Sequence, residues 1–216
     1  MITAPASATS TSTTVTLTAI RRLVQGRLHD DVLLAALESI FDAEPARAML
    51  RHRMPEHRWR DGQLDGHEFH RELTAAVHRG TPPGRAPCHL RAALRLLENY
   101  HFKPIPRFPA SETTYVDEKL GVRGIPDLVG YANGRRAIIE IKTVHTIPHD
   151  YAYLEHALQT SLLFQLVWGH RPHSRKNFLR VLYVESSSPH RAYLLPVQMP
   201  NRFCDVATAL AHHLRG

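Results

Sequence analysis

The chain has 216 residues, of which 43% are hydrophobic and 22% are charged, enough to bury one core and form one domain. No stretch approaches the ~20 apolar residues of a membrane helix, and the first 20 residues lack the basic and apolar regions of a secretory signal. The two cysteines, Cys88 and Cys204, match neither a disulfide framework nor a metal-ligand spacing. We therefore expect an intracellular protein, cytoplasmic or associated with the nucleus or nucleoid, that is neither secreted nor in a membrane.

The formal net charge is +7, and 16 histidines add charge at mildly acid pH. This balance favours polyanionic partners such as nucleic acid, although surplus arginine also keeps a protein in solution. Only four of the 27 basic residues are lysines, namely Lys103, Lys119, Lys142 and Lys176. Lys142 nevertheless lies in the most apolar predicted strand. An ammonium differs from a guanidinium in being a compact point charge, so this choice of lysine over arginine indicates a chemical role.

The N-terminal half is helical by pattern. A bias toward Ser, Thr and Ala predicts a disordered leader over 1–15, and 16–216 is expected to form a single domain. Pro45 is expected at the first position of the third helix, and 81–87 and 101–109 are expected to be irregular. Helical spacing of apolar residues predicts helices over 16–26, 30–44, 46–54, about 65–77, and 89–100.

From residue 112 onward the pattern changes to strands alternating with helices. A turn at 120–121 and the hairpin signal Asn133-Gly134 predict that the first three strands form an antiparallel meander. The order predicts an α/β fold with a mixed central sheet, a helical part over about 16–100 and a sheet core over about 110–200. Strands are predicted over 112–118, 122–131, 137–144, 179–186 and 192–199, and helices over 153–169 and 203–215.

Charged residues interrupt the apolar strand over 137–144. Side chains alternate along a strand, so Glu140 and Lys142 share one face while the residues between them pack on a helix on the other. Asp127 lies on the neighbouring strand across the hairpin, and two converging carboxylates repel each other unless a cation binds. A hard ion such as Mg²⁺, for which Mn²⁺ substitutes, prefers carboxylate and carbonyl oxygens, so Asp127, Glu140 and the carbonyl of Ile141 are candidate ligands. Lys142 is the candidate group to hold the attacking water or to neutralise a phosphate.

Each of these residues has a plainer alternative role. Asp127 could cap a turn after Pro126, and Glu140 with Lys142 could be an exposed ion pair of small energetic effect. The triplet 117–119 also reads acid-x-Lys, but it lies at a polar turn without an upstream Pro-Asp.

The order Pro-Asp, hairpin, Glu-x-Lys over 126–142 resembles the PD-(D/E)XK phosphodiesterase superfamily. The resemblance implies a restriction-endonuclease-like core and a metal-dependent nuclease with Asp127, Glu140 and Lys142 as catalytic residues. It extends at best over about 65–197 and is strongest over 122–144.

Two further elements resemble the RecB-like, phage-type exonuclease branch. The glycine-x-x-x-histidine element from Gly66 to His70 implies that His70 is a metal ligand, and a surface or packed helical histidine is the alternative. Gln159 stands where these nucleases carry a catalytic glutamine, implying that it positions the scissile phosphate or the attacking water, and a helix-surface amide is the alternative. Leu163 stands where the branch has tyrosine, a departure from the pattern.

The resemblance implies a Mg²⁺-dependent deoxyribonuclease acting in DNA processing, repair or recombination, with protein partners from such machinery. The clustered cysteines of iron–sulfur relatives are absent, so no iron–sulfur cluster is expected. The alternatives are an RNA endonuclease of the cap-snatching type and a non-catalytic nucleic-acid-binding subunit. The pattern does not predict exo- or endonuclease action, polarity, sequence preference, oligomeric state or pathway. Candidate phosphate contacts, each of which could also be a solvated loop charge, are Arg123, Arg135, Arg136, Arg171, Arg175 and Lys176.

Overall fold

The computed structural model describes residues 28–54, 66–105, 114–118, 122–186 and 190–213. The predicted leader over 1–15, the predicted helix over 16–26 and the turn at 120–121 lie outside these residues. Among the described helices, none has the length and hydropathy needed to cross a membrane.

The remaining helices of the N-terminal half are present, with shifted ends. The predicted helix over 30–44 stops at Glu38, where the Ser39 hydroxyl donates to the carbonyl of Ala36 at 2.7 Å. The next helix begins at Ala43 rather than at Pro45, which therefore occupies the third helical position; the first turn tolerates proline because its N–H groups have no helical partner. A 3₁₀ turn, η2 (Pro83–Arg85), lies in the segment expected to be irregular. The helices are α2 (Asp30–Glu38), α3 (Ala43–Leu50), α4 (Gly66–His78) and α5 (Cys88–Asn99).

A mixed five-stranded sheet forms the centre of the molecule, as the sequence predicts. Its order is β1-β4-β5-β6-β7, where β4 and β5 pair antiparallel through the Asn133-Gly134 turn, β5 and β6 pair parallel, and β6 and β7 pair antiparallel. The strands are β1 (Lys103–Pro104), β4 (Leu128–Ala132), β5 (Arg135–Val144), β6 (Asn177–Glu185) and β7 (Ala192–Pro196).

The predicted three-strand meander is wrong in one respect. β2 (Tyr115–Asp117) and β3 (Val122–Gly124) form a separate two-stranded sheet, and β1 takes the edge position beside β4. The predicted strand over 122–131 divides at Ile125 and Pro126, since proline lacks the N–H that a ladder needs. β1 approaches Gly130 so closely that a Cβ there would collide with the Lys103 carbonyl.

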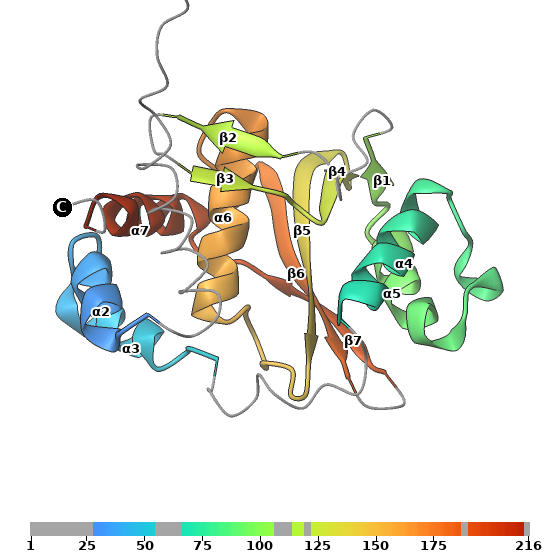
Figure 1. The fold of residues 1–216 in the computed structure, drawn as a ribbon, viewed down its shortest axis with the longest axis horizontal. Coiled ribbons are helices and arrows are strands. Elements are labelled where there is room, and N and C mark those ends of the chain that lie inside the picture. Colours follow the sequence, from blue (N-terminus) through green and yellow to red (C-terminus); the bar gives the residue numbers. More distant parts are fainter. Residues whose placement is uncertain (1–27, 55–65, 106–113, 119–121, 187–189, 214–216) are drawn as a thin grey trace, which may run out of the picture.

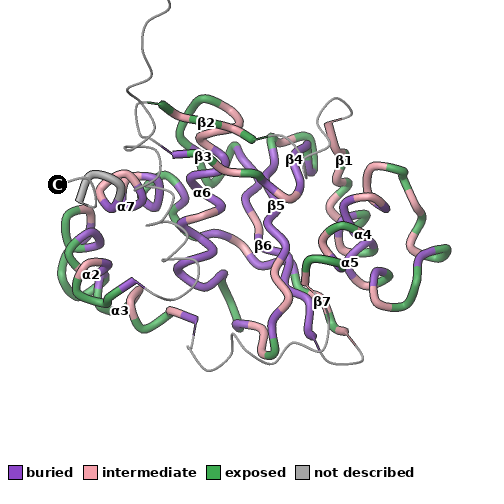
Figure 2. The backbone as a smooth tube through the Cα atoms, in the orientation of Figure 1, coloured by how far each residue is buried: buried purple, intermediate pink, exposed green. Residues whose placement is uncertain are grey.

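Helices cover both faces of the sheet (Figure 1), with α6 (Leu154–Trp168) backed by α2 and α7 (Pro200–His213) on one side and α4 and α5 on the other. On β5, Ile138 packs into the core under α6, whereas Ile139 and Ile141 pack into the core under α4 and α5. β5 and β6 are buried along most of their length (Figure 2). The expected alternation of β5 is confirmed, so Glu140 and Lys142 project toward α6.

Candidate functional site

Asp127 and Glu140 lie side by side across the β4–β5 hairpin. The last paired residues of β4 and β5 are Leu128 and Ile139. Asp127 directly precedes Leu128 and Glu140 directly follows Ile139, so the two acids are neighbours across the hairpin. The backbone N–H of Asp127 donates to Glu140 Oε1 at 3.2 Å. The expected convergence of these two acids is therefore present.

The carboxylate of Asp127 occupies the open side of β5. Its Oδ2 accepts the N–H of Ile141 at 2.7 Å, beyond the last paired residue of β4. A strand residue directs its N–H and C=O to the same side, so the carbonyl of Ile141 also points toward Asp127. This long-range acceptor role replaces the local turn cap that was the alternative for Asp127.

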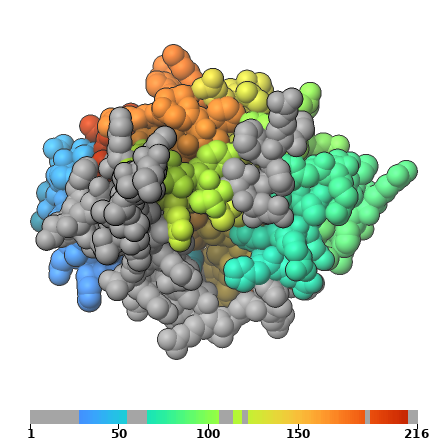
Figure 3. Space-filling view, turned by 45° about the horizontal axis from the view of Figure 1, so that its top comes forward, coloured from blue at the N-terminus to red at the C-terminus, as the bar shows by residue number. Residues whose placement is uncertain are grey.

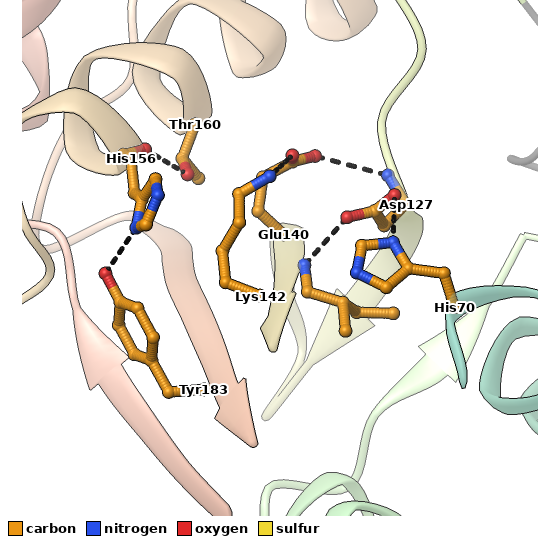
Figure 4. Close-up of polar contacts among 8 residues, drawn as sticks. His70, Asp127, Glu140, Lys142, His156, Thr160 and Tyr183 are labelled. Carbon is orange, nitrogen blue, oxygen red and sulfur yellow. Dashed lines mark hydrogen bonds and ion pairs between the residues drawn. The ribbon is translucent and has the colours of Figure 1, made fainter. Parts of the chain in front are cut away.

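α4 brings His70 to the same carboxylate (Figure 4). His70 Nδ1 lies 3.3 Å from Asp127 Oδ1, and both side chains are partly exposed. α4 buries Phe69 and Leu73 against the sheet face that carries Ile139 and Ile141. The contact therefore joins residues 57 positions apart, and the prediction that His70 is a metal ligand stays a prediction.

Gly66 permits the close approach of α4 to β5. A Cβ at this position would lie 2.7 Å from the Oγ1 of Thr143, closer than two such atoms can pack. Because Gly66 has no Cβ, the first turn of α4 can pack directly against β5. His70 lies about one turn further along the same helix.

Gly66→Ala is expected to lower the melting temperature by about 2–4 °C, because overpacking of roughly 1–3 kcal/mol exceeds the small gain in helix propensity. Thermal unfolding of Gly66→Ala, of Gly66→Ala with Thr143→Ala, and of Gly84→Ala measures this. The double variant should melt at a higher temperature than Gly66→Ala alone. Gly84→Ala should not lower the melting temperature, since no atom lies within 4 Å of a Cβ at that position. A Gly66→Ala protein as stable as the parent would contradict the proposed contact.

Lys142 completes the group from the α6 side of β5. Its Nζ donates to Glu140 Oε2 at 3.3 Å, with the Lys142 side chain 18% exposed and that of Glu140 2% exposed. The alternative of an exposed ion pair is therefore excluded. Figure 3 shows the surface hollowed between β2–β3 and α4.

The two acids have opposite titration behaviour. Burial raises the pKa of Asp127, but the His70 hydrogen bond and charge, the Lys142 charge and the Ile141 N–H outweigh it, so the pKa lies below its ordinary value. Burial and the charge of Asp127 raise the pKa of Glu140 to about 7, against the opposing effects of Lys142, the Asp127 N–H and His70. Asp127 is thus held ionised, whereas Glu140 is about half protonated near neutral pH.

The donor atoms suit a hard divalent cation, but they contact one another directly. Within the described ranges, no three His, Cys, Asp or Glu side chains are arranged to hold a metal ion. Asp127 Oδ1 and His70 Nδ1 face each other, and Glu140 is bound to the Asp127 N–H and to Lys142. An ion held by both His70 and Asp127 requires that this contact opens or that His70 binds through Nε2. The donor atoms are therefore of the kinds that such a cation prefers, but the described residues do not form a preformed metal-binding cage.

Gln159 lies on α6 and makes no hydrogen bond to the acids or to Lys142 in the described part of the chain. Its Oε1 is buried without a hydrogen-bond partner there. Leu163, one turn further along, packs beside Gly124, where a Cβ would strike its side chain. Residues four apart share a helix face, so Gln159 is directed toward the β2–β3 side of α6.

Sequence patterns did not predict the buried polar layer behind Lys142. Tyr183 accepts the N–H of Tyr153 at 3.0 Å and donates its O–H to His156 Nδ1 at 2.8 Å. Burial, and then the charge of Lys142, hold the pKa of His156 well below its ordinary value, so the ring is neutral. α6 is buried almost all round in its first three turns, and a helix without a polar face carries no periodic signal that separates these residues from core.

A second unpredicted contact ties the N-terminal helices to α6. Arg53 Nε donates to Glu155 Oε1 at 2.7 Å, and the N–H of Met54 donates to Glu155 Oε2 at 3.3 Å. Glu155 is fully buried, and Arg53 also contacts Asp30. This network contacts the first turn of α6 through Glu155 and fixes the position of that turn relative to residues 53–54.

Four of the six basic candidates gather at the turn end of the β4–β5 hairpin, in a pocket of about 590 Å³. Arg175 lies nearby in the chain and is exposed, and Arg123 is exposed on β3, apart from this pocket. We call the pocket the hairpin cleft; it is lined by Tyr131, Arg135, Arg136, His170, Arg171 and Lys176, among others.

Comparison of the chain with protein-family models and with curated protein sequences finds no match.

Proposed function

We propose that the protein is a metal-dependent nuclease that hydrolyses phosphodiester bonds of DNA. The observation that carries this proposal is the contact of a buried Glu140 with both the backbone N–H of Asp127 and the partly buried Lys142 ammonium. Two carboxylates and an amine on adjoining strands provide charge for a cation and for a phosphate at one point.

The cost of this arrangement argues for a chemical role. Taking charges out of water costs several kcal/mol per ion, and a buried pair recovers this only with excellent geometry. The raised pKa of Glu140 shows that its charged form is not fully compensated by its neighbours. Strongly perturbed acids beside a surface hollow are typical of functional sites, whereas a purely structural role would be served by apolar residues.

His70, Asp127, Glu140 and the carbonyl of Ile141 would hold one or two Mg²⁺ or Mn²⁺ ions. When bound, the ion supplies Lewis-acid stabilisation of negative charge on the phosphate and activation of water. Lys142, held by Glu140 at 3.3 Å, orients the attacking water or binds a non-bridging phosphate oxygen. Gln159 has an amide oxygen without a described partner and is the candidate to orient the water or the phosphate from α6.

Labelled single- and double-stranded DNA and RNA, incubated with Mg²⁺, Mn²⁺ or EDTA, test the proposal. We expect cleavage of DNA with either metal and none with EDTA. Lys142→Met should abolish cleavage while retaining DNA binding, because the substitution keeps the length of the side chain and removes its charge. Cleavage confined to RNA would favour the RNA endonuclease, and tight binding without metal-dependent cleavage of any substrate would favour a non-catalytic subunit.

A further inference from the structure

The hairpin cleft carries positive charge that carboxylates do not neutralise. Arg171 pairs with Asp205 at 2.8 Å, but among the described residues no carboxylate lies in ion-pair range of Arg135, Arg136 or Lys176. Pockets of about 300–1,000 Å³ accommodate small ligands, so the cleft at about 590 Å³ has room for a nucleotide unit.

Aromatic rings and a histidine ring nitrogen hold the arginines of the cleft in place. Arg136 Nη1 lies 2.6 Å from His170 Nε2, and this ring nitrogen must be an acceptor because a guanidinium only donates. The Arg136 guanidinium also lies 5.0 Å from the Trp168 ring centroid, and that of Arg135 lies 5.4 Å from Phe178. Both guanidinium groups are thus ordered by groups other than carboxylates, which leaves their charge available to an anion.

Tyr131 adds an exposed aromatic surface to the same cleft. The residue is 43% exposed, and its ring meets Trp168 at a centroid distance of 5.7 Å. Tyr131 is the register partner of Arg136. The cleft therefore combines phosphate-binding cations with a ring on which a base can stack, the combination used to bind single strands.

The cleft and Glu140 share one face of β5. Side chains alternate along a strand, so Arg136 projects to the same side as Glu140, four residues away along β5, and Tyr131, the register partner of Arg136, contacts Trp168 of α6 on that side. Four residues of strand span about 13 Å, so a single strand bound in the cleft has to run along the hairpin for at least this distance to reach Glu140.

We propose that the hairpin cleft binds backbone phosphates of single-stranded nucleic acid and stacks the adjoining base on Tyr131, away from the bond that is cut. The inference rests on the proposed function for the nature of the polymer. Single strands are specified because the bases of a duplex are stacked on one another and do not present a face to Tyr131.

Fluorescence anisotropy with labelled (dT)12 in EDTA, over a series of NaCl concentrations, tests the cleft without cleavage. Arg136→Gln with Lys176→Ala should weaken binding about tenfold or more and reduce the salt slope by about 1.4, or roughly 0.7 per lost phosphate contact. The matched control, Arg79→Ala with Arg85→Ala, removes two exposed cations elsewhere and should change neither quantity to this extent. Equal losses in both pairs would overturn the proposal, since net charge alone would then explain binding.

Tyr131→Ala separates single strands from duplexes. Loss of one stacked base should weaken (dT)12 binding about fivefold or more and leave binding of a 12-base-pair duplex unchanged. Unchanged (dT)12 affinity, or an equal loss for the duplex, would refute the assignment to single strands.

The cleft and the nuclease proposal fail separately. If the protein cuts no substrate but the cleft variants lose (dT)12 binding as expected, the cleft stands and the nuclease falls. If metal-dependent cleavage is present but the cleft variants bind (dT)12 as the parent does, the nuclease stands and the cleft falls.

Discussion

Asp127→Asn is expected to reduce metal-dependent DNA cleavage by about 10²–10³-fold or more, while the protein stays folded. Asparagine retains an oxygen that can accept the N–H of Ile141, but it removes the charge that faces His70 and a bound cation. Loss of one electrostatic group at a reacting centre typically costs a factor of this size. Initial cleavage rates under saturating Mg²⁺ or Mn²⁺ measure the effect.

Metal-dependent stabilisation gives the same variant a readout independent of activity. A ligand at 100 times its Kd raises the free energy of unfolding by about 2.7 kcal/mol, and this gain should vanish in Asp127→Asn. Glu72→Gln is the matched control, because Glu72 contacts His89 at 2.6 Å in another partly exposed carboxylate–histidine pair between α4 and α5. If Asp127→Asn keeps both the cleavage rate and the stabilisation by metal, the proposed site is wrong.

Local signals in the sequence were sufficient to predict the central hairpin. Asn133-Gly134 predicts the turn, and Asn133 and Gly134 both adopt positive φ, at 49° and 73°, as this kind of turn requires. Once the turn is known, the period of two places Glu140 and Lys142 on one face and Asp127 beside them. These parts of the site depend on residues close together in the chain.

Strand partners beyond the hairpin depended on contacts that no local pattern encodes. The two-residue strand Lys103–Pro104 is too short to show alternation, and its pairing with Gly130 and Tyr131 depends on close backbone approach at Gly130. Residues 115–117 alternate as a strand should, but the break at Pro126 separates them from the main sheet. Their position over α6 is therefore a tertiary property.

The surroundings of Lys142 could not be predicted for a related reason. His156 and Tyr183 lie on different elements, 27 residues apart, and Arg53 meets Glu155 over 102 residues. In a helix buried on nearly all sides, a polar residue that packs in the core has the same spacing as its apolar neighbours. The prediction for His70, a metal-ligand role, came only from the resemblance; its contact with Asp127 is a tertiary contact that depends on the close approach of α4 at Gly66.

Glu140→Gln is expected to be increasingly more stable than the parent as pH rises from about 4.5 to above 7, in the absence of divalent metal. The pKa of Glu140 is raised from 4.5 to about 7, so the folded protein keeps a proton that the unfolded chain has already lost. The unfolded state then binds fewer protons, and the free energy of unfolding of the parent falls as pH rises through this window. The full shift corresponds to at most about 3 kcal/mol, and glutamine mimics the protonated acid at every pH.

Denaturant unfolding gives the free energy of unfolding of both proteins at several pH values between 4 and 8.5. The difference between the two free energies cancels the titration of the histidines common to both proteins. The pKa of Asp127 is held below its ordinary value by His70, Lys142 and the Ile141 N–H, and this residue is present in both proteins. Glu185→Gln is the control for loss of a buried carboxylate; it removes the negative charge and one of the two acceptors of Arg191 and should destabilise the protein rather than stabilise it at pH 8.

Mg²⁺ or Mn²⁺ should reverse this effect in the parent. Binding of a cation requires Glu140 to release its proton, so stabilisation by metal should be larger at pH 8 than at pH 6, and it should be much smaller in Glu140→Gln at both. A parent protein whose stability relative to Glu140→Gln does not change between pH 5 and 8 would show that Glu140 is not held against the charge of Asp127. Equal stabilisation of the two proteins by metal would show instead that the cation binds elsewhere.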